Sequence, residues 1–166
     1  TGEVHLSMVD STPVTRDLDA RSIPYRFFRH TGEVRSLEQA AAERGQRPEQ
    51  VIRSILFRLA EDQFVMVLIA GETQVSWPAL RKYLGQSRLT MASQAEVLAA
   101  TRYQTGSVSP FGLPAVMRVL ADESIFQPDE VSIGSGERGT TVILKREDLL
   151  RALDWVERGV FASEPV

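Results

Sequence analysis

The stretch around which the chain is organised is TGSVSPFGL, residues 105–113. A helix interior is excluded here, because Gly106, Pro110 and Gly112 each break a helix. The stretch carries no charge, and we expect a tight loop that follows a helix and leads into a strand. Composition leaves two interpretations open. One is a structural turn, and the other is a loop whose uncovered backbone N–H groups hold an anion or a developing oxyanion.

The composition around this loop is that of one globular domain. The chain has 166 residues, of which 43% are hydrophobic and 25% are charged, as is ordinary for a soluble protein. It has no cysteine and only two histidines, which excludes disulfides and thiolate metal sites and argues against a histidine-rich metal site. We therefore expect no metal and no cofactor.

Charge and hydropathy limit the partners of the protein. The net charge of −3 gives no general attraction to nucleic acid, so an RNA contact would need a local basic patch. No apolar run approaches the ~18 residues of a membrane span, and the N-terminus lacks a signal-peptide pattern. We expect a cytoplasmic protein that binds neither membranes nor DNA.

Short helix and strand signals alternate irregularly on both sides of the loop. Helices are expected to begin at hydroxyl N-caps or charged first turns, and strands at β-branched or aromatic runs. Residues 64–70 are almost all apolar, which predicts a central strand covered on both faces. The expected helices span residues 12–22, 37–44, 79–84, 93–101 and 146–156, and the expected strands 25–30, 52–58, 64–70, 88–91, 116–121, 131–133 and 140–144.

Strict βαβ alternation is missing from this order of elements. We therefore predict an α/β fold with a mixed, partly closed barrel-like sheet and flanking helices. The predicted organisation is an N-terminal extension over residues 1–11, a single domain over residues 12–157 and a C-terminal tail over residues 158–166.

A second glycine-rich segment, residues 134–139, has the letters of a dinucleotide-binding fingerprint, G-x-G-x-x-G. Such a site needs a helix after the glycines, whereas residues 140–144 are expected to form a strand. A hairpin-type turn is therefore favoured over nucleotide binding. Two roles are open for Arg138 in this turn, a phosphate contact or a solvated turn residue.

Three further side chains, Arg53, His30 and Ser109, are candidates for a functional role. Arg53 interrupts the apolar run 51–56 and is either an edge residue that reaches solvent or a cation at the wall of a pocket. His30 ends an aromatic strand and by itself is more typical of a structural or exposed residue than of a catalytic one. Ser109 has no evident His and Asp partners in the sequence, which disfavours a serine-nucleophile triad.

Taken together, these motifs resemble the YbaK/ProX family of aminoacyl-tRNA deacylases, relatives of the editing domain of bacterial prolyl-tRNA synthetases. The resemblance runs from about Thr12 to Leu153. It is most specific at residues 106–112, where the family has a similar G-x-(V/I)-S-P-(F/L)-G form. It implies the mixed α/β editing-domain fold and hydrolysis of the ester between a wrong amino acid and the 3′-terminal adenosine of a tRNA. The first candidate is tRNA-Pro carrying a smaller amino acid, and a synthetase partner is left open.

The resemblance places the pocket between residues 105–113 and a facing strand and helix. Backbone N–H groups of the loop would stabilise the tetrahedral oxyanion of ester hydrolysis, so that no metal or protein nucleophile is required. The residues that it implies for catalysis are Arg53, Gly106, Ser107, Val108 and Ser109. Those that it implies for substrate binding are His30, Pro110, Phe111, Gly112 and Arg138.

One position departs from the family pattern, since Lys is usual where this chain has Arg53. Arginine keeps the positive charge and can clamp the phosphate of the terminal adenosine with two hydrogen bonds, but it does not lose its proton. The departure keeps a second hypothesis open, a non-catalytic module that binds an aminoacyl-tRNA end or a synthetase.

Overall fold

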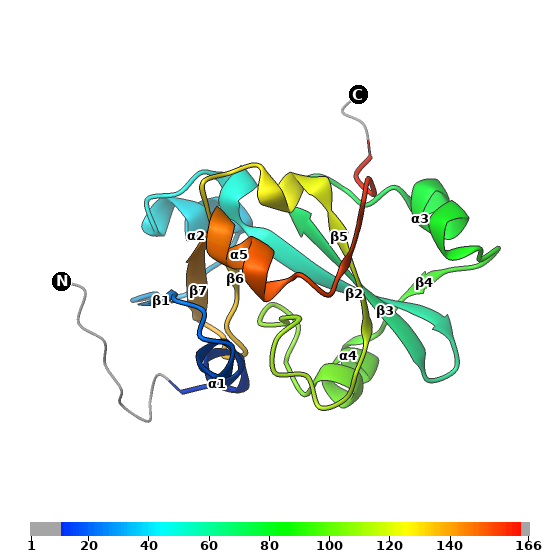
Figure 1. The fold of residues 1–166 in the computed structure, drawn as a ribbon, viewed down its shortest axis with the longest axis horizontal. Coiled ribbons are helices and arrows are strands. Elements are labelled where there is room, and N and C mark those ends of the chain that lie inside the picture. Colours follow the sequence, from blue (N-terminus) through cyan, green and yellow to red (C-terminus); the bar gives the residue numbers. More distant parts are fainter. Residues whose placement is uncertain (1–10, 164–166) are drawn as a thin grey trace.

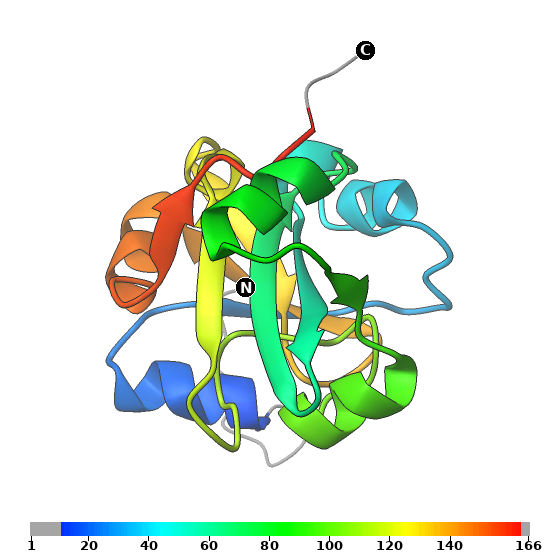
Figure 2. The ribbon, with the colours of Figure 1, turned by 90° about the vertical axis from the view of Figure 1, so that its right-hand side faces the viewer.

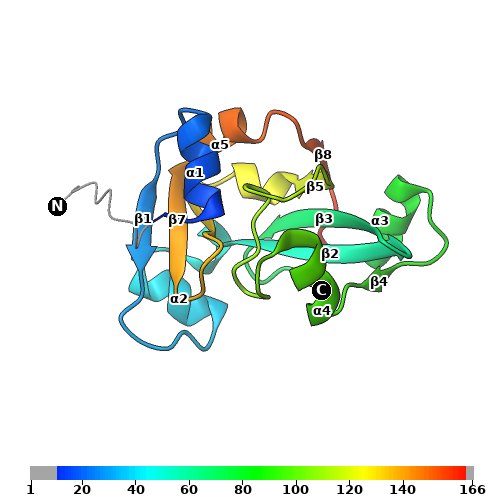
Figure 3. The ribbon, with the colours of Figure 1, turned by 90° about the horizontal axis from the view of Figure 1, so that it is seen from below.

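The computed structural model describes residues 11–163 and contains two β-sheets (Figures 1 and 3). The first sheet is antiparallel, with the strand order β1 (Arg26–Arg29), β7 (Thr140–Lys145) and β6 (Glu130–Gly134). The second has the order β4 (Thr90–Met91), β2 (Ile52–Ala60), β3 (Gln63–Ala70), β5 (Arg118–Asp122) and β8 (Glu157–Gly159). In the second sheet β5 runs parallel to both of its neighbours. The predicted mixed α/β fold is confirmed, with two open sheets rather than a closed barrel. The predicted N-terminal extension lies outside the described residues, apart from Ser11.

Four of the five α-helices begin at the hydroxyl residues that predict them. The side chains of Thr12, Ser36, Ser76 and Ser93 each accept a hydrogen bond from the backbone N–H three residues later, which satisfies a free donor of the first turn. No helix of the described chain is long and apolar enough to cross a bilayer. The α-helices are α1 (Pro13–Ala20), α2 (Leu37–Glu43), α3 (Trp77–Leu84), α4 (Gln94–Thr101) and α5 (Arg146–Ala152), and the 3₁₀ helices are η2 (Pro48–Gln50) and η3 (Glu123–Phe126).

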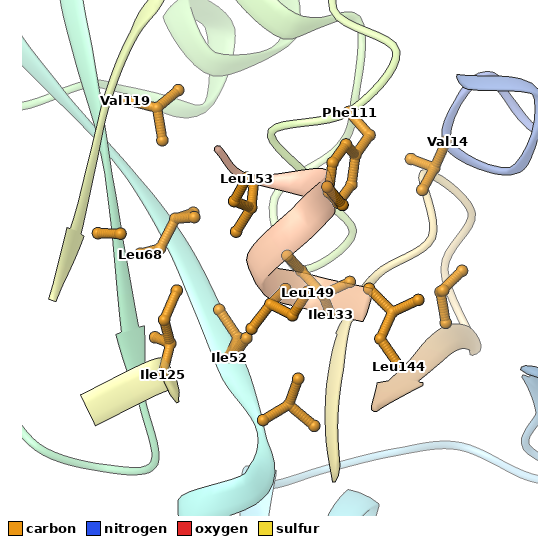
Figure 4. Packing of buried hydrophobic residues seen from close by; sticks show 14 of the residues in the cluster. Val14, Ile52, Leu68, Phe111, Val119, Ile125, Ile133, Leu144, Leu149 and Leu153 are labelled. Carbon is orange, nitrogen blue, oxygen red and sulfur yellow. The ribbon is translucent and has the colours of Figure 1, made fainter. Parts of the chain in front are cut away.

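Strand β3 lies at the centre of the larger sheet and is buried on both faces, as its sequence predicts. Val67 and Ile69 point to one face, where they pack with residues of α3, which lies across this side of the sheet in Figure 2. Met66 and Leu68 point to the other face, into the main core with α1, α5 and Phe111 of the loop at residues 105–113 (Figure 4). The loop is thus part of the core as well as of the surface.

The C-terminal segment differs from the expectation. Helix α5 ends at Ala152, four residues earlier than predicted, and the indole N–H of Trp155 donates to the freed carbonyl of Ala152 at 3.0 Å. The chain then forms β8, which pairs with β5, and buries Phe161 in the second hydrophobic cluster. Neither feature was predicted, because the three residues of β8 (Glu-Arg-Gly) have no apolar member.

Asp122 attaches this C-terminal segment to the sheet. Its buried carboxylate accepts the N–H groups of Phe161 at 2.6 Å, Ala162 at 3.0 Å and Ser124 at 3.0 Å. We expect Asp122→Ala to lower the free energy of unfolding by about 3 kcal/mol, because several partly buried donors lose their acceptor. Denaturant unfolding checks this. The control is Asp129→Ala, since the Asp129 side chain is 96% exposed; equal effects in the two variants would contradict the assignment.

Candidate functional site

A cavity of about 500 Å³ lies between α2, the first sheet and the edge of β2. On the first sheet, Ser132 and Thr141 alternate with the core residues Ile133 and Val142, so their side chains face away from the main core. The cavity therefore lies on the opposite side of this sheet from α1. Its walls are residues 30, 34–37, 40, 44, 51–54, 106, 108, 132–134 and 138–141.

The edge of β2 is open where it meets the cavity. β4 covers this edge only further along the strand, and Val51 forms an isolated bridge with Ser132 of β6. The carbonyl of Val51 points towards β3 and accepts a hydrogen bond from the N–H of Gly71 at 2.8 Å. The carbonyl of Leu56 points to the opposite side of β2 and accepts a hydrogen bond from the N–H of Ala92 at 3.0 Å. Because these directions alternate along a strand, the N–H and C=O of Ser54 point away from β3, towards the open edge.

The two glycine-rich segments pack against each other beside this edge. A side chain at Gly134 would collide with the carbonyl of Val108, and the N–H of Gly136 donates to the carbonyl of Ser107 at 3.0 Å. Residues 134–139 connect the antiparallel strands β6 and β7, which confirms the predicted hairpin turn. The glycines of this turn allow the loop at residues 105–113 to approach β6.

Two residues of the loop line the cavity, Gly106 and Val108. Gly106 has φ +95°, a conformation that is strained for other residues. The N–H of Ser107 already donates to the carbonyl of Gln104 at 3.0 Å, whereas those of Gly106 and Val108 make no hydrogen bond to any described residue. These two N–H groups are therefore available as donors.

The second half of the loop lies away from the cavity and anchors it. Ser109 and Pro110 are buried, and the Ser109 hydroxyl accepts the N–H of Phe111 at 3.3 Å. The Phe111 side chain is in the main core (Figure 4), and the N–H of Gly112 donates to the carboxylate of Asp17 at 2.8 Å. Of the expected loop residues, Ser109, Pro110, Phe111 and Gly112 thus hold the loop in place without lining the cavity.

Arg53 lines the cavity from the open part of β2, so both sequence interpretations of this residue apply. Its Nη2 donates to the carbonyl of Thr73, while its Nε is buried and has no partner among the described residues. Burial lowers the pKa of Arg53, an effect that nearby Glu72 opposes. The side chain is positioned by one hydrogen bond and has donor capacity left for a ligand.

Arg44 is a cavity residue that the sequence analysis missed. Leu37, Ala40 and Arg44 follow one another at helical spacing on α2 and its C-cap, and all three line the cavity. The Nε of Arg44 is also buried without a partner among the described residues, and burial lowers the pKa of this guanidinium. The sequence did contain a signal for this position. Arg44 follows Leu37 by seven residues, which places both on the same face of α2, the face that turns towards the cavity.

The cavity is rich in unpaired polar atoms and basic groups. Ser54 Oγ and Ser132 Oγ are buried without a hydrogen bond to any described residue, and Ser132 is 0% exposed. Among the described residues that line the cavity there is no carboxylate, but there are four arginines, Arg35, Arg44, Arg53 and Arg138. This is a local basic patch in a chain with a net charge of −3. Residues 11–163 contain no cluster of three or more His, Asp and Glu side chains that would hold a metal ion.

His30 lies in the cavity wall with its side chain 3% exposed. Its Nδ1 is 2.8 Å from a carboxylate oxygen of Glu43 on α2. An ionised carboxylate only accepts hydrogen bonds, so Nδ1 is the donor in this contact. Arg138, by contrast, is exposed at the rim of the cavity and forms no ion pair with a described residue. The expected substrate-binding residues His30 and Arg138 therefore both border the cavity.

The His30–Glu43 contact predicts a pH-dependent contribution to stability. Hydrogen bonds from His30 and then Gln39 lower the pKa of Glu43 from its ordinary value of 4.5. A depressed pKa stabilises the fold above the unfolded-state value, and this contribution is lost as the pH falls through the folded-state value. We expect Glu43→Gln to lower Tm at pH 7 and to have less effect at pH 3. Glu38→Gln controls for the loss of a charge from the same helix, and an unchanged difference at pH 3 would contradict the prediction.

Comparison with known proteins identifies the family of the chain. The model of the aminoacyl-tRNA editing domain matches residues 31–152. The proline–tRNA ligase of Streptococcus pneumoniae is 30% identical over 109 residues, which is 66% of this chain but only 18% of the ligase. The chain thus matches less than a fifth of the length of this relative.

Solved structures share the fold. A candidate trans-editing enzyme for prolyl tRNA synthetase has a TM-score of 0.84 and 20% identity, with 96% of this chain and 99% of that chain covered. The hypothetical protein APE2540 has a TM-score of 0.81 and 20% identity, with 92% of this chain and 100% of that chain covered. The family match spans most of the described residues, including every element that forms the cavity wall from α2 onward. The chain therefore belongs to the aminoacyl-tRNA editing domain family.

Proposed function

We propose that this protein hydrolyses the ester bond of mischarged aminoacyl-tRNAs in trans, and that tRNA-Pro carrying a smaller amino acid is its substrate. The oxygen of a water molecule bonds to the acyl carbon, the bond from that carbon to the ribose oxygen breaks, and the ribose oxygen takes up a proton. The products are a free amino acid and a tRNA with an intact 3′ end. The reaction takes place in the cytoplasm, with an aminoacyl-tRNA synthetase as the second partner.

The observation that carries this proposal is a cavity lined by arginines and free backbone donors, with no carboxylate among its described residues. We assign the N–H groups of Gly106 and Val108, which have no partner among the described residues, to the oxyanion that forms as water adds. The N–H of Ser54, at the open edge of β2, is a further donor. Such donors act without rearrangement during the reaction. Arg53 anchors the phosphate of the terminal adenosine, for which its planar guanidinium is suited.

The relatives support the choice of tRNA-Pro. The matched ligase is specific for proline by name, and one structural relative is described as a candidate editing enzyme for prolyl tRNA synthetase. Action in trans is proposed because the structural relative is described as a candidate trans-editing enzyme for prolyl tRNA synthetase.

A panel of mischarged tRNAs tests the proposal. The measurement is the loss of labelled amino acid from Ala-, Ser-, Cys- and Pro-tRNA-Pro, and from the same amino acids on their own tRNAs. We expect loss of at least one wrong amino acid from tRNA-Pro and retention of proline. Binding of these tRNAs without ester loss over hours would contradict the enzyme and support a binding module. The motivation for this alternative is Arg53, which stands where the family usually has lysine. Such binding should weaken steeply with salt if phosphates are contacted.

Gly106→Ala tests the backbone donors. The position has φ +95° and no atom within 4 Å of an added Cβ, so alanine fits sterically but shifts the backbone away from this conformation. We expect the deacylation rate to fall about 10²-fold, as when an oxyanion donor is displaced. Gly85→Ala is the matched control, since Gly85 has φ +67°, equally open space and is not among the residues that line the cavity. Equal rates in the two variants would argue against the assigned donors.

A further inference from the structure

Helix α1 binds both glycine-rich segments, although the cavity lies on the opposite side of the first sheet. Its N-cap, Thr12, donates from Oγ1 to the carbonyl of Ser135 at 2.6 Å. The N–H of the next residue, Gly136, donates to the carbonyl of Ser107 at 3.0 Å. Ser107 lies between the two residues whose N–H groups are assigned above to the oxyanion. The first contact of α1 thus reaches this pair of donors through the turn at residues 134–139.

The second contact of α1 holds the other end of the loop at residues 105–113. One carboxylate oxygen of Asp17 accepts the N–H of Gly112 at 2.8 Å, and the other accepts the Nε of Arg21 at 2.8 Å. The guanidinium carbon of Arg21 lies 5.9 Å from the ring centre of Phe111 and 5.8 Å from that of Trp155. Because both of its oxygens have a partner, the carboxylate of Asp17 is held with one oxygen facing the loop.

The chain between these two contacts is stiff. The carbonyl of Phe111 accepts from the hydroxyl of the buried Tyr103 at 2.6 Å. Burial, and then the charge of Asp17, raise the pKa of Tyr103 to about 12, so that this hydroxyl remains a donor at neutral pH. The N–H of Phe111 donates to the hydroxyl of Ser109, and the residue between them is a proline with a fixed φ. A displacement at one end of this segment is therefore transmitted to the other end.

We propose that α1 positions the oxyanion donors and that Asp17 is its positioning residue, acting through Gly112. This inference rests on the proposed deacylase function and adds a part of the chain to it. Asp17 is not among the residues that line the cavity, and α1 lies outside residues 31–152, which the family model matches. A displacement of about 1 Å caused by a distant change can cost about 10²-fold in rate. Asp17 therefore affects the reaction without touching the substrate.

Asp17→Ala removes the acceptor of the Gly112 N–H. We expect the single-turnover rate on the best substrate of the tRNA panel to fall by about tenfold to 10²-fold. The Kd of that tRNA should stay within about threefold, because the lost contact serves the transition state and not binding. Asp19→Ala is the control, since Asp19 is exposed on the same helix. Weaker binding with an unchanged rate for bound tRNA would overturn the proposal.

Asp17→Asn separates the hydrogen bond from the charge. The amide oxygen of asparagine still accepts the N–H of Gly112, whereas the ion pair with Arg21 is lost. The side chains of this pair are 38% and 23% exposed, and such pairs contribute little, so we expect a rate within about threefold of the unchanged protein. Urea unfolding of both variants corrects each rate for the folded fraction. An equal loss of rate in Asp17→Asn and Asp17→Ala would overturn the assignment to Gly112.

A double-mutant cycle shows whether Asp17 acts through the donors. In Gly106→Ala the donors are already displaced, so Asp17→Ala should cost less than about threefold more in that background, as coupled residues do. Both single variants and the double variant are measured on the same tRNA under single-turnover conditions. If the two single losses multiply in the double variant, Asp17 acts independently of Gly106 and the proposal is wrong.

Amide chemical shifts separate this inference from the proposed function. If the unchanged protein hydrolyses no ester, the proposed function fails, but the ¹H–¹⁵N signals of Gly106 and Val108 still report where these two N–H groups lie. We expect both signals to move in Asp17→Ala and to stay in place in Asp19→Ala and Asp17→Asn. Changes in Asp17→Ala that are confined to Gly112 and its neighbours would overturn the inference, even if the deacylase activity is found.

Discussion

The Arg53→Ala variant is expected to lose about 10²- to 10³-fold in kcat/KM on the best substrate of the tRNA panel, the range for removing one partner of a hydrogen-bonded charge pair. The loss has two causes. The variant removes the charge at the open edge of β2, and it also removes the hydrogen bond from Nη2 to the carbonyl of Thr73 that orients this charge. Single-turnover deacylation, with folding checked by circular dichroism, measures the effect.

Two further variants show what the cation does. Arg53→Lys keeps the charge and is expected to remain within about tenfold of the unchanged protein, because ammonium and guanidinium both pair with phosphate. Arg58→Ala is the matched control on the same strand, where Arg58 is exposed, pairs with Glu96 and does not line the cavity. If Arg53→Ala were as active as Arg58→Ala, the cation would have no part in the reaction. If Arg53→Lys were as inactive as Arg53→Ala, the bidentate geometry rather than the charge would be required.

The second large effect concerns stability, at Gly112. An added Cβ would lie 2.5 Å from the carbonyl oxygen of Pro13 and 2.6 Å from the hydroxyl of Tyr103, in a residue with φ +67°. That hydroxyl already donates to the carbonyl of Phe111 at 2.6 Å, so it is not free to move away. Gly112→Ala is expected to lower the free energy of unfolding by about 3 kcal/mol or more, the upper range for overpacking.

Gly85 provides the control for backbone conformation. It has the same φ of +67° but no atom within 4 Å of an added Cβ. Gly85→Ala should therefore cost only the left-handed conformation, about 1 kcal/mol, and the difference between the variants isolates the collision. Urea unfolding of both proteins measures it. A difference below about 1 kcal/mol would mean that α1 moves easily away from the loop.

Local signals in the sequence were sufficient for most elements of the fold. Hydroxyl caps such as Ser36 and Ser93 fix helix starts through hydrogen bonds within three residues, and these depend on no distant part of the chain. The almost entirely apolar sequence of β3 likewise predicts, without any distant residue, that both faces of this strand are buried. β8 has no such signal, because three polar and small residues become a strand only through the partner that β5 offers.

The site was predictable in part for the same reason. Arg53 and Gly106 are unusual within their own segments, one a charge in an apolar run and the other a glycine in an uncharged loop. Arg44 is not unusual on a helix end, and Ser132 is not unusual in a strand. Their importance arises where α2, β6 and the edge of β2 meet. That meeting depends on long-range packing, which one sequence does not display.

The loop at residues 105–113 and the turn at residues 134–139 that packs against it both bind the N-terminal helix, which is far away in the sequence. Thr12 donates to the carbonyl of Ser135 across 123 residues, and Gly112 donates to Asp17 across 95. Closing such long segments is entropically expensive and slow, so contacts of this kind form late in folding. The cavity cannot exist before the hairpin of β6 and β7 has been synthesised. We therefore expect nascent chains that end before this hairpin to contain the β2–β3 pair without the cavity.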